Sequence, residues 1–195
     1  MTIGPLARTT AGVGFTQIVG WGTTYLMPSV LGRDIQAALD MPAEMIFAGI
    51  TISSAAGAII APRVGRFVDR SGARAIMSAG SLAYALALVG LSQCWDVASY
   101  LAFWAVVGIA SSLALSTTAS IALVQVAGPR ARQAISLLTI IAGLSSSIFW
   151  PITGLLDAAL GWRMTLLAFA ALHVFVCLPV HILVLPSRPP VHPAA

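Results

Sequence analysis

Apolar residues occur along the chain in six long stretches, separated by short polar or turn-forming segments. We place these stretches at Gly12–Leu31, Ala43–Pro62, Ala75–Gln93, Ala98–Val126, Ala134–Ala158 and Arg163–Leu185. Each is long enough for an α-helix to cross the hydrocarbon core of a bilayer, which is about 30 Å thick and needs roughly 20 residues. The pattern predicts an all-α integral membrane protein with six transmembrane helices.

The composition agrees with this prediction. Of the 195 residues, 58% are hydrophobic and 8% are charged, whereas an ordinary soluble domain carries about 25% charged residues. A soluble core of this size could not hide so much apolar surface. The composition therefore excludes a cytosolic enzyme, a nucleic-acid-binding module and a disordered chain.

The charged residues predict the orientation in the membrane. All ten basic residues are Arg. With the N-terminus in the cytoplasm, only Arg33 and Arg163 lie outside, and eight lie inside: Arg8, Arg63, Arg66, Arg70, Arg74, Arg130, Arg132 and Arg188. By the positive-inside rule, both termini are cytoplasmic. We expect a cytoplasmic tail over 1–11, the bundle over 12–185 and a Pro-rich cytoplasmic tail over 186–195, in a bacterial inner membrane.

Small residues recur at every fourth position in two of the stretches. One series is Gly49, Ser53, Gly57 and Ala61, and the other is Gly108, Ser112, Ser116 and Ser120. Residues at this spacing share one helix face, and small side chains let two helices approach closely in lipid. We expect two packing seams, with cavity lining by the Ser residues as the alternative.

The segment between the second and third stretches carries a motif. It reads Gly65-Arg66-Phe67-Val68-Asp69-Arg70-Ser71-Gly72-Ala73-Arg74. It resembles the signature loop of the major facilitator superfamily, Gly-x-x-x-Asp-Arg-x-Gly-x-Arg, and matches at Gly65, Asp69, Arg70, Gly72 and Arg74. A second likeness to that family is Gly161-Trp162-Arg163.

The resemblance covers almost the whole chain, but only as the N-terminal six-helix half of the usual twelve helices. It implies a bundle of two three-helix repeats (3+3). It also implies that the loop is a conformational latch, in which Asp69 meets the start of a helix in the other half. Gly65 and Gly72 are expected to relieve steric limits at two helix ends.

The sequence also departs from the family. Trp104 stands four residues before Gly108, where members often have an Arg, and no Asp, Glu or Arg lies at mid-depth in any stretch. A buried ionisable residue is the usual mark of an ion or proton relay, so this half is not expected to carry the coupling carboxylate. We expect Asp157 and Arg163 to form a structural ion pair. His173 and His181 are expected to pack between helices.

One face of the first stretch combines polar and aromatic side chains. Gln17, Trp21, Thr24 and Tyr25 fall at i, i+4, i+7 and i+8, which is one helical face. The family resemblance implies that spans one and four line the cavity. The candidate cavity residues are Gln17, Trp21, Thr24, Tyr25, Ser112, Ser116, Ser146 and Trp150.

These observations favour a secondary-transporter half, not an enzyme. It would move a small organic solute after pairing with a second six-helix bundle, either a copy of itself in a homodimer or another chain. Its contacts would be solute and membrane lipid, with no nucleic acid, cofactor or metal. One alternative is a non-transporting fragment, scaffold or accessory membrane subunit. A remote alternative is an intramembrane hydrolase that uses Ser145 and His173.

Overall fold

A computed structural model describes residues 4–186, and within this range the ordered elements are helices. Two short helices, α1 (Pro5–Thr23) and α2 (Pro28–Leu39), precede the long α3 (Ala43–Ser92). They are followed by α4 (Val97–Ala114), α5 (Ser116–Ala127), the 3₁₀ turn η1 (Gly128–Arg130) and α6 (Ala131–Gly143). The last elements are α7 (Ser145–Leu172), a π-helical turn η2 (His173–Cys177) and α8 (Leu178–Val184).

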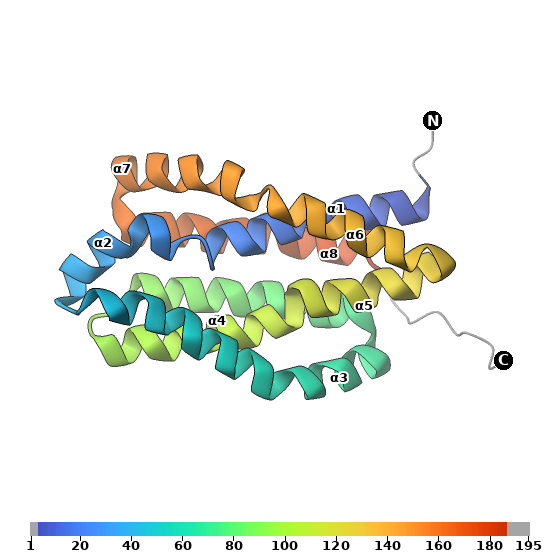
Figure 1. Ribbon diagram of the computed structural model, residues 1–195, viewed down its shortest axis with the longest axis horizontal. Helices are drawn as coiled ribbons and strands as arrows, with labels where there is room; N and C mark the ends of the chain where they lie inside the picture. The colour runs from blue at the N-terminus through green and yellow to red at the C-terminus, as the bar shows by residue number, and fades with distance from the viewer. Residues whose placement is uncertain (1–3, 187–195) are drawn as a thin grey trace.

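Two of these helices each consist of two arms joined at a glycine. Gly72 interrupts α3 with φ 80° and ψ 154°, and Gly161 interrupts α7 with φ 77° and ψ 163°. Only glycine adopts this backbone conformation without strain. The chain therefore reverses at both points, as Figure 1 shows for each helix.

The turns and connections gather at two opposite ends of an elongated bundle (Figure 1). The start of α1, the end of α8, the reversal within α3 and the α5–α6 connection lie at one end, and the α2–α3 connection, the α3–α4 connection and the reversal within α7 lie at the other. Arg8 Nη2 donates to the Leu183 carbonyl at 3.1 Å, which joins the first and last helices. Among the described Arg residues, seven lie near the start of α1, the turn in α3 or η1: Arg8, Arg63, Arg66, Arg70, Arg74, Arg130 and Arg132. Arg33 is on α2, and Arg163 follows the turn in α7.

The outside of the bundle is apolar. Ile59, Leu86, Leu155 and Phe175 are each at least 70% exposed. Two helical stretches, Ala43–Ser92 and Val97–Val184, are long and apolar enough to cross a membrane. Water would disfavour so much exposed apolar surface, whereas lipid accepts it. The chain is a membrane protein.

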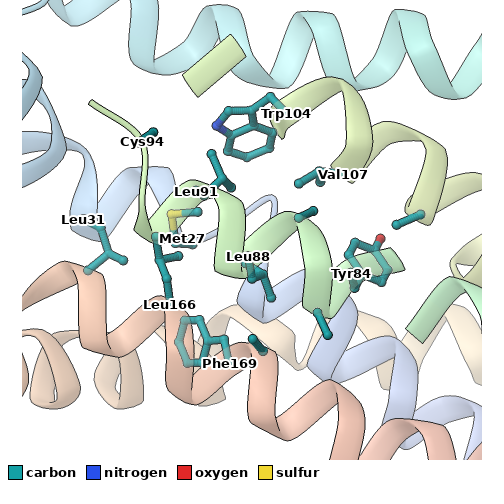
Figure 2. Packing of buried hydrophobic residues seen from close by; sticks show 14 of the residues in the cluster. Met27, Leu31, Tyr84, Leu88, Leu91, Cys94, Trp104, Val107, Leu166 and Phe169 are labelled. Carbon is teal, nitrogen blue, oxygen red and sulfur yellow. The ribbon is translucent and has the colours of Figure 1, made fainter. Parts of the chain in front are cut away.

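The core packs the second arm of α3 between α4 and α7. Figure 2 shows Leu88 and Leu91 of α3 between Trp104 of α4 and Phe169 of α7. All four side chains are at most 2% exposed. This cluster holds together helices from both halves of the sequence.

The first arm of α3 meets α4 along the two predicted series of small residues. A Cβ atom on Gly108 would collide with the backbone carbonyl of Ser53, and one on Gly57 would lie 3.1 Å from the Gly108 carbonyl oxygen. Ser112 Oγ also donates to the Gly57 carbonyl at 2.8 Å. We call Ser53, Gly57, Gly108 and Ser112 the α3–α4 seam. The predicted packing role is confirmed for this part of the two series.

Several boundaries differ from the sequence-based expectation. The first helix begins at Pro5, inside the tail expected over 1–11. The chain leaves the helix between α1 and α2 and again at Leu115, between α4 and α5. Residues 187–195 lie outside the described range, and so do Arg188 and almost all of the tail expected over 186–195.

Candidate functional site

Two neighbouring recesses open on one side of the bundle and share Trp21 and Ser116. One has a volume of about 230 Å³ and lies among α1, α3, α4 and α5; its lining residues are Trp21, Tyr25, Ser53, Ser54, Gly57, Ser111, Ser112, Leu115, Ser116 and Thr117. The other has a volume of about 280 Å³ and lies among α1, α5 and α6; its lining residues are Gln17, Trp21, Ser116, Ser120, Leu138, Thr139, Ala142 and Gly143. We call them together the groove.

Helix α1 contributes the aromatic side chains of the groove. Trp21 lies one turn after Gln17, and Tyr25 follows just past the end of the helix. The Trp21 and Tyr25 rings are tilted, with centroids 5.0 Å apart. Of the predicted stripe of Gln17, Trp21, Thr24 and Tyr25, the structure places Gln17, Trp21 and Tyr25 along the groove, and their role in solute binding stays a prediction.

The break between α4 and α5 leaves backbone carbonyls available to side chains. Leu115 is extended, with φ −92° and ψ −159°. The Ala114 carbonyl accepts a hydrogen bond from Gln17 Nε2 at 2.9 Å, and the Ser112 carbonyl accepts one from Thr118 Oγ1 at 2.7 Å. Broken helices that expose backbone groups beside a cavity are a recurring device of membrane transporters.

A chain of hydroxyl groups crosses the groove wall from α3 to α4. Tyr25 Oη lies 3.0 Å from Ser53 Oγ and donates to Ser111 Oγ at 3.3 Å. Tyr84 Oη lies 2.8 Å from the same Ser111 Oγ, which in turn donates to the Val107 carbonyl at 2.8 Å. Because Ser111 has only one proton, both tyrosines donate to it and Ser53 donates to Tyr25. The wall is thus a directed network rather than a set of free hydroxyls.

Three of the predicted cavity residues lie elsewhere. Thr24 is 1% exposed, and its hydroxyl donates to the Gly20 carbonyl of its own helix. Ser146 is exposed on α7 and does not line either recess. Trp150 is 55% exposed and lines a separate recess with Ser29, Val30 and Arg33. The structure therefore brings together Gln17, Trp21, Tyr25, Ser112 and Ser116, but not these three.

Other lining residues were missed as candidates. Ser54 on α3 lines one recess and Thr139 on α6 lines the other. Ser53 also reaches the groove, although its series was assigned to packing. Ser54 follows Ser53 but lies outside the four-residue series, and Thr139 stands between apolar residues, so no spacing pattern distinguished either of them.

The motif loop is mostly helical. Gly65 lies within the first arm of α3, and no neighbour would meet a Cβ atom there within 4 Å. The expectation that Gly65 relieves a helix end is therefore wrong, because the helix continues to the turn at Gly72. Asp69 and Arg70 are exposed, Arg74 is half-buried, and Arg63, Arg66, Phe67 and Arg70 surround a small recess of about 190 Å³.

The ion pair expected between Asp157 and Arg163 is also wrong. Arg163 Nη2 instead donates to the carbonyl of Cys94, just after the end of α3, at 3.1 Å. The Arg163 guanidinium also lies 4.2 Å from the centre of the Trp162 ring. Asp157 faces the carboxyl group of Asp34 on α2. The short spacing between the two residues suggested a pair, but the turn at Gly161 sends them to different neighbours.

The two buried histidines bind hydroxyl groups of neighbouring helices. His181 Nδ1 lies 2.9 Å from Ser81 Oγ, and its Nε2 lies 3.0 Å from Thr16 Oγ1. His173 Nε2 lies 2.9 Å from Thr23 Oγ1, and its ring stacks on Tyr84 with centroids 4.8 Å apart. The packing role expected for both residues agrees with these contacts.

The arrangement offers little to hydrolytic or metal chemistry. Ser145 Oγ donates to the Ala142 carbonyl of the preceding turn, while His173 is engaged with Thr23 and Tyr84. Among the described residues, no group of three or more His, Cys, Asp or Glu side chains is placed to hold a metal ion. What the groove can do is bind a solute through hydroxyl, amide and aromatic groups.

Comparison with known proteins gives one family. The model of the Major Facilitator Superfamily matches residues 11–195. No curated protein matches the chain, and no solved structure matches it.

Proposed function

Because the chain belongs to the major facilitator superfamily, we propose that it is one half of a secondary transporter. It moves a small organic solute across the membrane after pairing with a second six-helix bundle, which is either a copy of itself or another chain. The alternative is a non-transporting accessory or scaffold subunit with the same fold.

The proposal assigns six spans to the helices. The first is α1 with α2, the second and third are the two arms of α3, and the fourth is α4 with α5. The fifth is α6 with the first arm of α7, and the sixth runs from the second arm of α7 through η2 to α8. An arm of 20 residues is about 30 Å long, so each of these segments suffices to cross the bilayer. Spans one to three and four to six form the 3+3 repeats.

The observation that carries the proposal is the polarity of the groove. Its hydroxyl, amide and indole groups come from α1, α3, α4, α5 and α6, and Ser116 and Thr117 are exposed on its wall. Polar groups exposed on a membrane helix are costly against lipid hydrocarbon and usually face a cavity or another helix. A second bundle that closes the groove would supply both an enclosed cavity and helices for these polar groups to face. Secondary transporters bind solutes at such an interface.

The distribution of Arg residues supports an orientation with both termini in the cytoplasm, in a bacterial inner membrane. Seven described Arg residues lie near the start of α1, the turn in α3 or η1, at the end of the bundle where α8 also ends. Cytoplasmic ends carry such an excess.

The exposed Asp69 at the end of the first arm of α3 is then a latch residue that meets the start of a partner's α6. In a twofold dimer, Asp69→Cys would approach Gln133→Cys of the second copy. Cys94 and Cys177 are both buried, and burial raises the pKa of the Cys94 thiol, so background cross-linking is low. Oxidation in native membranes is expected to trap a covalent dimer of the double variant and of the mixed single variants.

The control replaces Asp157 instead of Asp69, since Asp157 stands at the opposite end of the bundle. A monomer in every sample contradicts pairing between two copies of this chain. Pairing with a different chain is then tested by whether a second six-helix protein co-purifies. Solute uptake by proteoliposomes separates a transporter from an accessory subunit. A stable dimer or complex without uptake of any solute tested contradicts transport.

A further inference from the structure

Gln17 has one hydrogen-bonding group that the protein leaves unused. Its Nε2 donates to the Ala114 carbonyl at 2.9 Å, and since a carbonyl only accepts, this bond fixes which end of the amide is which. Its Oε1 is buried and has no partner among the described residues, although the side chain is 1% exposed and lines the groove. A buried acceptor without a donor is destabilising, so this oxygen calls for a donor from outside the chain.

The other polar groups of the groove also present acceptors. The hydroxyl protons of Ser54 and Ser112 are donated to the carbonyls of Ile50 and Gly57 at 2.9 and 2.8 Å. Thr139 donates to the Ile135 carbonyl at 3.1 Å. A hydroxyl whose proton is committed offers only lone pairs to a ligand. Of the described groove residues, Ser116, Thr117 and Ser120 have hydroxyls that can turn either way, and Trp21 carries an indole N–H donor.

The groove carries no formal charge. None of the residues that line its two recesses in the described structure is Asp, Glu, Arg or His. This wall therefore offers no cation to a carboxylate or phosphate and no carboxylate to an ammonium group, and an unpaired charge against it would be poorly compensated. Its aromatic component is the Trp21–Tyr25 pair, which suits a neutral apolar or C–H surface.

We propose that the groove binds an uncharged solute that donates an N–H or O–H hydrogen bond to Gln17 Oε1, while Trp21 packs against the solute's apolar face. This inference rests on the proposed function, because it names the chemical class of the transported solute. Gln17 is then a specificity-determining residue that prefers donor-bearing solutes to their alkylated counterparts. Such sites discriminate strongly, because the wrong solute leaves the buried acceptor unpaired.

Access to Oε1 requires a small movement of the wall. The oxygen is closed to solvent as the side chains stand. Trp21 is half-buried, lines both recesses and lies one turn from Gln17. The proposal therefore requires that a displacement of the Trp21 indole ring exposes the Gln17 amide oxygen to the solute.

The test measures binding rather than transport, so it does not depend on uptake. The full chain in mild detergent is heated with four classes of probe at equal concentration. These are small polyols and primary amides; their O-methylated and N,N-dimethylated counterparts; carboxylates of the same carbon number; and alkylammonium ions. A ligand that binds the folded state raises the midpoint of thermal unfolding.

At least one neutral donor-bearing probe is expected to raise the midpoint, and blocking its donors is expected to weaken binding roughly tenfold or more. Gln17→Met is expected to remove this preference, whereas the matched control Gln125→Met keeps it. Preferential stabilisation by carboxylates or ammonium ions, equal stabilisation by the alkylated probes, or no response to any donor-bearing probe overturns the inference. The comparison of probes on the unmodified chain decides the matter even where Gln17→Met fails to fold.

Binding with this selectivity but without uptake in proteoliposomes contradicts the proposed transport alone. Uptake of a charged solute instead supports transport and contradicts the inference. The two failures are therefore distinguishable.

Discussion

The α3–α4 seam and the groove share a helix face but serve different purposes. At the seam, Gly108 lies against the Ser53 backbone and Ser112 Oγ donates to the Gly57 carbonyl. One and two turns further along the same series, Ser116 is exposed on the groove wall and Ser120 is half-buried in it. Ser53, Gly57 and Ser112 belong to both regions, since they also line one recess of the groove. The helix breaks at Leu115, between Ser112 and Ser116. A regular small-residue stripe can thus change from helix contact to cavity lining where the helix breaks.

The largest effect is expected at the seam. Gly108→Ala places a methyl group against the Ser53 backbone, which cannot move without separating α3 from α4. We expect a loss of about 3 kcal/mol or more in the free energy of unfolding, or failure to fold. Thermal unfolding in detergent measures the loss. Gly154→Ala is the control, because no atom lies within 4 Å of its Cβ position, and wild-type stability in both variants would contradict the close approach.

The two motif glycines are expected to differ. Gly72→Ala must adopt φ 80°, which costs a side-chain-bearing residue about 1–3 kcal/mol. Gly65→Ala lies in a helix with open space around it, so its stability is expected to stay within about 1 kcal/mol of wild type or to rise. Chemical or thermal unfolding of both variants decides the point, and equal losses would restore the idea of two turn glycines.

The next largest loss of stability is expected at His181 of α8, which is hydrogen-bonded to Thr16 of α1 and Ser81 of α3. His181→Leu removes the bonds to Ser81 and Thr16, whose buried hydroxyls keep only their bonds to the Met77 and Val13 carbonyls. We expect a loss of about 1–3 kcal/mol, measured by thermal unfolding. Truncating Ser81 and Thr16 to Ala and Val in the same background should recover part of the loss, and no recovery would show that ring packing alone matters.

The smallest difference in stability is expected between alanine substitutions of Ser112 and Ser116, two serines of the same series. Ser112→Ala removes the bond to the Gly57 carbonyl and is expected to cost about 1 kcal/mol. Ser116→Ala touches an exposed group and is expected to stay within about 0.5 kcal/mol of wild type. Its effect should fall on solute binding instead, and the reverse order of stabilities would mean that the seam extends past Leu115.

The sequence pattern predicted an apolar, all-helical membrane chain, since apolar periodicity is a local property, whereas its division into six spans stays a prediction. Gln17, Trp21 and Tyr25 lie on one wall of the groove because their spacing at i, i+4 and i+8 places them on one helix face, and a role in solute binding stays a prediction. Trp150, Ser146 and Asp157 were misplaced for a tertiary reason. Their neighbours depend on how the arms of α7 turn at Gly161 and on which helix lies opposite, and neither is encoded in local spacing.

The Gln17 amide shows the same limit. The position of Gln17 on the helix face was predictable, but the unpaired amide oxygen was not. That oxygen is left free because the amide nitrogen donates to the Ala114 carbonyl, which the break at Leu115 leaves available. Nothing in the Ser-rich run around Leu115 predicted a break there.

The most direct test of the account asks whether the groove faces water or lipid. Single cysteines at Ser116, in the groove, and at Leu155, on the apolar exterior and 73% exposed, are treated with a charged, membrane-impermeant maleimide in native membranes. A completed transporter holds water in its groove, so the account predicts that the Ser116→Cys thiol reacts and that the Leu155→Cys thiol does not. An unreactive Ser116→Cys, protected to the same degree as Leu155→Cys, would contradict the claim that this wall is half of a transport pathway.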